Sequence, residues 1–318
     1  MADDGRQSTV AGADEEQAAR RKPRVALALG AGGAKGLAHI GAIEEILAQG
    51  LDIVAIAGTS MGALIGGIHA TGKMDVYRDW VTTLARMDVL KLVDWSFTGG
   101  GLIKGDKIIG VMRELIGDVN IENLPLPYTA VAVDLERERE AWLVKGSLFD
   151  AIRASIAIPS LMRPYRLDGR VLVDGALLNP VPVTPLIREP ADFLIAVSID
   201  GPVDNALHAP AVETVPDSNT RPSLGDYLSR FNPLAGSEAK PREPGMLELL
   251  SQSLDLMQAN LARVRLVAYP PDLLIELPRN ISSVYEFYRA QELIELGRLK
   301  AREALASWLP AALVQRGY

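Results

Sequence analysis

Cysteine is absent from this chain of 318 residues. Its absence excludes disulfide bonds, a thiolate nucleophile and any metal site built on cysteine. Histidine is scarce, with 3 residues in the whole chain, so few imidazole groups are available for a catalytic or metal site.

Long hydrophobic runs and net positive charge are also missing. No apolar run reaches the ~18 residues of a membrane-spanning helix, and residues 1–22 lack the apolar core of a secretory signal. The net charge of −7 argues against nucleic acid as a general partner. We therefore expect a soluble cytoplasmic protein.

Hydrophobic residues make up 48% of the chain, enough for one large α/β domain or two small ones. Residues 1–22 have the composition of a disordered tail. The basic cluster at 20–24 either contacts anionic lipid or is a solvated flank of the first strand. Residues 201–245 predict a polar insertion. Because the apolar segments after it fit the same core, we expect one domain over residues 23–318.

The domain begins with two strand–turn–helix units. An apolar strand at 25–29 precedes a glycine-rich turn at 30–36 and a helix at 37–49. A second strand at 52–57 leads into Gly58-Thr59-Ser60-Met61-Gly62 and a helix. This βαβα order predicts a mostly parallel sheet.

The pentapeptide around Ser60 has the form G-x-S-x-G between a strand and a helix. In that context the motif predicts a nucleophile elbow, with Gly58 and Gly62 where neighbouring backbone passes too close for a Cβ atom. The alternative is a serine that only caps the following helix.

The sequence of the glycine-rich turn does not match two common nucleotide-binding motifs. A Walker A loop needs Ser or Thr after the lysine, but Lys35 is followed by Gly36, and no G-x-G-x-x-G spacing begins at Gly30 or Gly32. An oxyanion hole remains, with the backbone N–H groups of Gly32 and Gly33 as donors. Lys35 either adds positive charge near the site or only flanks the turn.

A serine nucleophile needs a base, and no histidine follows a late strand. We expect His39 and His69 to be structural. Asp174 ends a strand and is followed by Gly175 and Ala176, so its carboxylate is a candidate base that reaches Ser60 across a parallel sheet. The alternative is an aspartate that caps a turn.

Two later segments carry weaker signals. Apolar residues at spacings of three and four predict an amphipathic helix over 246–266 that packs on the core, Met257 and Val264 among them. The glycines at 99–101 form either a lid or a plain connection. A final helix is expected at about 284–308.

The glycine turn with its lysine, G-x-S-x-G and Asp-Gly-Ala, in this order, resemble the patatin-like phospholipase family. The similarity extends to segments resembling small bacterial members related to neuropathy target esterase. These segments are 36–41, Arg153-Ala154-Ser155 before Pro159, and Val173-Asp174-Gly175-Ala176 before Asn179-Pro180-Val181-Pro182. One departure is Ala31, where many members have glycine.

The resemblance implies a single α/β domain, a mostly parallel sheet with helices on both faces, and a Ser60–Asp174 dyad with the glycine turn as oxyanion hole. It implies hydrolysis of lipid acyl esters without a metal or cofactor, as a phospholipase A, lysophospholipase or carboxylesterase. The expected substrates are phospholipids, lysophospholipids or fatty-acyl esters, with transient contact at the inner membrane face. An acyltransferase and a non-catalytic lipid-binding regulator are the alternatives. The sequence carries no signal for an oligomeric state.

Overall fold

The computed structural model describes residues 21–94, 101–204, 246–283 and 285–318. The strands are β1 Arg24–Leu29, β2 Asp52–Thr59, β3 Gly101–Ile103, β4 Tyr128–Asp134, β5 Arg139–Leu143, β6 Ser160–Met162, β7 Tyr165–Leu167, β8 Arg170–Asp174, β9 Phe193–Gly201 and β10 Leu273–Pro278. The α-helices are α2 Ala38–Ala48, α3 Met61–Ala70, α4 Met74–Thr82, α5 Arg86–Leu92, α6 Asp106–Ile116, α7 Leu148–Ser155, α9 Met246–Ala268 and α10 Ala290–Arg316. Short 3-10 helices are η1 Gly33–Leu37, η2 Ile121–Asn123, η3 Gly175–Leu177, η4 Thr184–Leu186 and η6 Phe287–Arg289.

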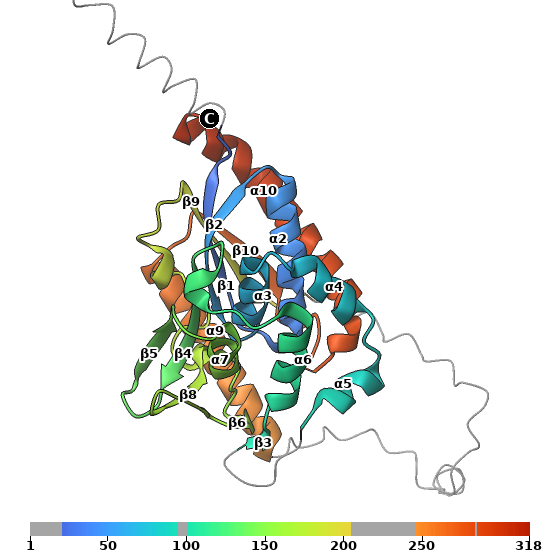
Figure 1. Ribbon diagram of the computed structural model, residues 1–318. Helices are drawn as coiled ribbons and strands as arrows, with labels where there is room; N and C mark the ends of the chain where they lie inside the picture. Colours follow the sequence, from blue (N-terminus) through green and yellow to red (C-terminus); the bar gives the residue numbers. More distant parts are fainter. Residues whose placement is uncertain (1–20, 95–100, 205–245, 284) are drawn as a thin grey trace, which may run out of the picture.

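One central sheet organises these elements (Figure 1). Its strand order is β10-β9-β1-β2-β4-β8-β7, and β5 also pairs with β4. The strands from β10 to β4 are parallel, whereas β5, β8 and β7 join in antiparallel pairs. Strands β3 and β6 form a small separate sheet. The predicted single α/β domain with a mostly parallel sheet is confirmed.

Strand β1 shows how the sheet is covered on both faces. Its large side chains, such as Leu27 and Leu29, join the core formed with α2, α3 and α10. The alternate residues Ala26 and Ala28 lie in a second cluster with Ala262 of α9. Through Ala262, α9 contacts this face of the sheet, opposite α2 and α10 (Figure 1). Helices therefore cover both faces, as predicted.

Helices α2 and α10 cross with their backbones in contact. A Cβ atom at Gly41 would lie 1.9 Å from the carbonyl oxygen of Ile294, and one at Gly297 would lie 1.9 Å from that of Ala38. Only glycine fits at such a crossing, because any side chain would force the helices apart. The contact fixes α2, and with it the glycine turn before α2, against the C-terminal helix.

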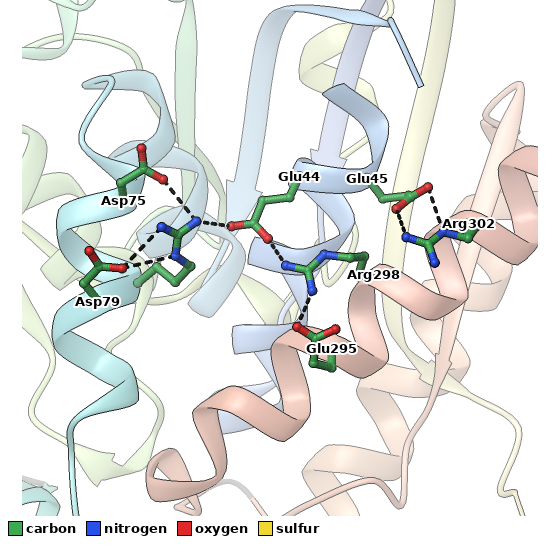
Figure 2. Close-up of polar contacts among 8 residues, drawn as sticks. Glu44, Glu45, Asp75, Asp79, Glu295, Arg298 and Arg302 are labelled. Atoms are coloured by element: carbon green, nitrogen blue, oxygen red, sulfur yellow. Dashed lines mark hydrogen bonds and ion pairs between the residues drawn. The ribbon is translucent and has the colours of Figure 1, made fainter. Parts of the chain in front are cut away.

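An ion-pair network ties α2 to its two neighbouring helices (Figure 2). Glu44 of α2 lies between Arg78 of α4, at 2.8 Å, and Arg298 of α10. Glu45, whose side chain is buried, pairs with Arg302 of α10 at 2.9 Å. The network thus joins segments far apart in the sequence on one face of the sheet.

Two expectations about helices are wrong. Met257 and Val264 of α9 are 67% and 66% exposed and do not pack on the core, because α9 turns a different set of residues, including Ala259 and Ala262, toward the sheet. Helix α10 begins at Ala290, later than predicted, and continues through Pro310 to Arg316. Pro310 is exposed, so water can solvate the carbonyl that the proline leaves without a donor.

The predicted tail and insertion lie mainly outside the described residues, which exclude 1–20 and 205–245. Strand β9 runs through Gly201, where the insertion was expected to begin. In the basic cluster before β1, Arg21 pairs with Asp192 at 2.9 Å. Of the glycine-rich loop, residues 98–100 lie outside the described residues and Gly101 opens β3.

Candidate active site

Ser60 lies in a strained turn between β2 and α3. Its φ of 55° and ψ of −121° are unusual for a residue with a side chain. A Cβ atom at Gly62 would lie 2.1 Å from the carbonyl oxygen of Leu29, and one at Gly58 would lie 2.3 Å from that of Gly62. Both glycines therefore permit the close backbone approach that the sequence motif predicts.

Ser155, at the end of α7, holds this turn in place. Its fully buried hydroxyl accepts a hydrogen bond from the backbone N–H of Ser60 at 2.9 Å and donates one to the carbonyl of Val131 at 2.6 Å. Sequence reasoning assigned Ser155 no role. The available signal was a serine in the last turn of a predicted helix, where its hydroxyl can bond outside the helix.

Asp174 approaches Ser60 from an unexpected direction. Thr59 pairs with Val131 of β4, and the next residue of β4, Ala132, pairs with Asp174. Strand β8, however, runs antiparallel to β4, so the expected approach across parallel strands is wrong. The register nevertheless brings the Asp174 carboxylate beside the Ser60 hydroxyl, and both side chains line one cavity.

Both interpretations of Asp174 hold at once. It caps η3, because its carboxylate accepts the N–H of Ala176 at 2.9 Å, and the same carboxyl group lies beside Ser60. A Cβ atom at Gly175 would lie 2.2 Å from the carbonyl oxygen of Val131. Glycine at that position lets the chain pass close to β4 directly after Asp174.

The electrostatics of the Asp174 carboxyl are set by burial. Ser60 and Asp174 are only 4% and 3% exposed. Loss of hydration raises the pKa of Asp174 to about 7, against smaller opposing effects of the neighbouring Ser60 hydroxyl and of the Ala176 N–H. A carboxylate with a pKa near neutrality is a much better proton acceptor than an ordinary aspartate.

The glycine turn presents two free amides beside this pair. The N–H groups of Gly30 and Ala31 donate to the carbonyls of Val197 and Pro180, each at 2.9 Å. Those of Gly32 and Gly33 meet no acceptor within the part of the chain that the structure describes. Gly33 has a φ of 56°, which glycine adopts without strain. Ala31 therefore serves the scaffold, and its departure from the family pattern removes no donor.

His39 supports the turn from behind. It is fully buried in α2, and burial lowers its pKa to about 4, although its bond to Gly30 opposes the shift. The ring is therefore neutral, and Nε2–H donates to the carbonyl of Gly30 at 2.8 Å. The structural role expected for His39 agrees with this geometry. His69 lies near the end of α3, and His208 is outside the described residues.

Ser60, Asp174, Gly32 and Gly33 line one cavity of about 190 Å³. One part of the lining, which we call the apolar wall, comprises Ile158, Pro159 and Leu161, with Ser160 among them. The polar part of the lining, which we call the polar wall, comprises Lys35, Asp200, Asp255, Gln258 and Tyr285. The remaining predicted motif residues, Gly30, Gly36, Gly58, Gly62 and Gly175, do not line the cavity but let the surrounding backbone pack closely.

Lys35 lies within this polar wall rather than outside the site. Its Nζ donates to the carbonyl of Arg279 at 3.3 Å. Burial raises the pKa of Asp200, and the positive charge of Lys35 partly offsets that rise. The predicted alternative in which Lys35 adds positive charge near the site thus fits its position.

The described residues contain neither a clustered metal site nor a membrane-spanning helix. No group of three or more His, Asp or Glu side chains there is placed to hold a metal ion. None of the helices described is both long and apolar enough to cross a membrane.

Comparison with known proteins agrees with these motifs. Residues 27–187 match the family model described as patatin-like phospholipase. An uncharacterized NTE family protein of Mycobacterium tuberculosis is 38% identical, over 90% of this chain and 92% of its own length. Neuropathy target esterase sws of Drosophila melanogaster is 28% identical over 58% of this chain and 13% of its own length.

Among solved structures, one that aligns with this chain is VipD from Legionella pneumophila. It aligns with a TM-score of 0.42 and 14% identity, over 90% of this chain and 67% of that chain. The family model covers the strands and turns that carry Ser60, Asp174, Gly32 and Gly33. The chain belongs to the patatin-like phospholipase family and is related to neuropathy target esterase.

Proposed function

We propose that the protein is a serine lipid acyl hydrolase of the phospholipase A, lysophospholipase or carboxylesterase type. One observation carries the proposal: a buried Ser60–Asp174 pair shares a cavity with the unoccupied amides of Gly32 and Gly33. A serine in a strained turn, with a buried carboxylate beside it to accept its proton, is the arrangement of an activated nucleophile.

In the proposed acylation step, Asp174 accepts the proton of the Ser60 hydroxyl while Oγ attacks the ester carbonyl. The N–H groups of Gly32 and Gly33 then stabilise the negative charge on the carbonyl oxygen. Collapse of the tetrahedral intermediate breaks the ester bond, and protonated Asp174 gives its proton to the leaving alcohol. The fatty acyl group remains on Ser60.

In the second step, Asp174 takes a proton from a water molecule that attacks the acyl-enzyme. The fatty acid leaves, and the proton returns to Ser60 Oγ. The polar wall of the cavity suits the alcohol side of a lipid ester, and the apolar wall at 158–161 suits the acyl side. Phospholipids, lysophospholipids and fatty-acyl esters all fit this division.

Fluorophosphonate labelling tests the proposal, with the modified peptide identified by mass spectrometry. We expect wild type to be labelled at Ser60, Ser60→Ala to take no label and Asp174→Asn to label at least ~100-fold more slowly. Ser160→Ala is the matched control, because Ser160 lines the same cavity and is exposed. It should label like wild type.

Folded wild-type protein that takes no label, or a Ser60→Ala variant that still does, would contradict the proposal. Product analysis then follows with lysophospholipid and short-chain esters, with and without an added alcohol acceptor. Free fatty acid as the main product in both conditions supports a hydrolase, and acyl transfer to the acceptor would instead support an acyltransferase.

A further inference from the structure

The outer face of α9 is apolar. Five of its residues, which we call the outer stripe, are at least half exposed: Leu249 50%, Leu256 58%, Met257 67%, Val264 66% and Val267 83%. At ~100° per residue they fall on one side of the helix, and at ~1.5 Å per residue they extend over about 27 Å. Ser253 and Asn260 lie between them, and Arg263 is at the edge. This exposed apolar strip is a candidate binding surface, interrupted only by two small polar side chains.

The inner face of the same helix belongs to the candidate active site. Ala259 and Ala262 are buried against the sheet, and Leu254 and Gln258 line the cavity that holds Ser60. Helix α9 therefore separates the cavity from whatever covers the outer stripe. Figure 1 shows α9 running along one side of the sheet and not inside a bundle of other helices.

The volume of the cavity favours a lipid surface as the partner of the outer stripe. At about 190 Å³ it is smaller than the ~300–1,000 Å³ of pockets that enclose a drug-sized ligand. It can hold an ester group and nearby carbons, while the rest of a long-chain lipid stays outside. Tyr285 lines the cavity yet is 56% exposed, and tyrosine is typical of the interface between membrane and water.

A second copy of this chain fits the outer stripe less well. A strip about 27 Å long and ~10 Å wide offers ~270 Å², well below the ~800 Å² that each partner contributes to a typical stable interface.

The stripe also contains no cationic residue, and the chain has a net charge of −7, so attraction to anionic surfaces is weak.

We propose that the outer stripe of α9 docks on the surface of a neutral lipid bilayer and inserts its apolar side chains among the head groups. Docking holds the protein at the lipid surface, with the cavity on the inner side of α9, and so concentrates the proposed site beside lipids that carry an ester. The inference rests on the proposed function only for the choice of lipid as the partner.

Sedimentation with sucrose-loaded phosphatidylcholine vesicles tests this docking. The proteins are wild type, Ser60→Ala, the double variant Leu256→Glu/Val264→Glu, and the matched control Val76→Glu/Val314→Glu. The control replaces two valines, 43% and 77% exposed, on α4 and α10. We expect wild type, Ser60→Ala and the control to bind the vesicles alike. The α9 variant should bind them at least about tenfold more weakly.

Two further arms make the result specific. Binding through apolar insertion should change little between low salt and about 0.5 M salt, and phosphatidylglycerol vesicles should bind no more tightly than phosphatidylcholine. Circular dichroism and the Tm show whether each variant is folded. Because binding is measured without turnover in Ser60→Ala, docking can fail while Ser60 labelling succeeds, and the reverse.

Equal vesicle binding by wild type and the α9 variant overturns the proposal, as does wild-type protein that binds no vesicles. A wild-type dimer in light scattering that becomes a monomer in the α9 variant, with vesicle binding unchanged, assigns the stripe to a second copy. A lower Tm with unchanged binding shows that another part of the same chain covers the stripe.

Discussion

At the scale of single residues, the carboxyl of Asp174 is where stability and the proposed chemistry conflict. Its burial raises its pKa to about 7 from an ordinary value of 3.8. Folding therefore favours the protonated form, whereas the proposed mechanism requires the ionised form. Two predictions follow from this one shift, one for activity and one for stability.

The first prediction concerns the pH dependence of activity. We expect kcat/KM on a soluble short-chain ester to rise about tenfold per pH unit below about pH 7 and to level off above it, because Asp174 must be ionised to accept a proton. The measurement is a pH–rate profile from about pH 5 to about pH 9. His39, with its pKa lowered to about 4 by burial, cannot produce this step. A flat profile across this range would contradict Asp174 as the base.

The second prediction concerns the stability of Asp174→Asn. The folded-state pKa lies above the unfolded value, so the wild type loses stability as pH rises from about 4 to about 7, where the buried carboxyl ionises. We therefore expect Asp174→Asn to have a higher Tm than wild type at about pH 8, with the difference vanishing near pH 4. Thermal unfolding at both pH values measures it.

Asp134→Asn is the matched control for that experiment. Asp134 is also buried, and burial raises its pKa, but hydrogen bonds from Arg137 at 3.0 and 3.1 Å outweigh this and leave the pKa below its ordinary value. Its contribution has the opposite sign, so Asp134→Asn should lower the Tm at about pH 8. If Asp174→Asn and Asp134→Asn shifted the Tm in the same direction, the opposite pKa shifts assigned to Asp174 and Asp134 would be refuted.

The third prediction is that Ser155 positions Ser60. Ser155→Ala leaves the buried N–H of Ser60 and the carbonyl of Val131 without this partner. We expect about 1–3 kcal/mol lower stability and at least ~10-fold slower fluorophosphonate labelling of Ser60, because the strained turn loses its support. Ser155→Thr, which keeps the hydroxyl, should recover labelling. A loss of stability with normal labelling would show that Ser155 is structural only.

At the scale of elements, glycine fixes how α2 and α10 meet. In both helices a glycine occupies the point of closest approach, so the crossing depends on two positions far apart in the chain. A glycine inside a helix costs about 1 kcal/mol relative to alanine. Close packing of the two helices offsets that cost here. A glycine-to-alanine substitution should therefore lower stability at the crossing and raise it at an open position of a helix.

The fourth prediction uses this contrast. Gly297→Ala places a Cβ atom 1.9 Å from the carbonyl oxygen of Ala38, so we expect a loss of several kcal/mol from overpacking, about 2–4. Gly110→Ala in α6 is the matched control, since nothing lies within 4 Å of its added Cβ. The control should gain about 0.5–1 kcal/mol. Urea unfolding of both variants measures the difference, and equal effects would refute the close crossing.

Helix α9 shows the limit of periodicity at this scale. The spacing of its apolar residues correctly predicts a helix, but both of its faces carry apolar side chains. Periodicity alone cannot say which face packs on the sheet, because that depends on where the helix lies relative to it. The more exposed face is the one for which we propose a lipid partner.

At the scale of the whole molecule, charged side chains join helices that the sequence keeps far apart. Glu44 and Glu45 of α2 contact α4 and α10, which belong to opposite ends of the chain (Figure 2). Of the two carboxylates, Glu45 depends more on its hydrogen-bond and ion-pair partners, because it is less exposed to water. Its side chain is buried, with Arg302 and Gln49 as hydrogen-bond partners.

The fifth prediction is a pH-dependent loss of stability in Arg302→Gln. The bond from Arg302 holds the pKa of Glu45 below its ordinary value of 4.5, so the pair stabilises the fold above that pH and loses this effect as pH falls. We expect about 1–3 kcal/mol lower stability at about pH 7 and a smaller difference near pH 4. Lys300→Gln, whose partner Glu303 is 54% exposed, should change stability by less than about 0.5 kcal/mol. Equal losses at both pH values would argue against the ion pair.

The sequence by itself determined the local geometry of the site. Gly58, Ser60 and Gly62 encode the strained turn because a few consecutive residues define its backbone, and the same holds for the amides of Gly32 and Gly33. These motifs also carry the resemblance that the family comparison confirms. Parallel strands and helices on both faces follow from the order of apolar segments, since each element buries its own apolar side chains.

Only the tertiary structure decided which distant residues meet and what burial does to them. Asp174 reaches Ser60 from an antiparallel strand, and Ser155 supports the elbow from a helix far along the chain. Both contacts depend on strand register, which many residues set together. The pKa of Asp174 depends on how completely water is excluded. Such properties arise from the packed whole, so no short stretch of sequence encodes them.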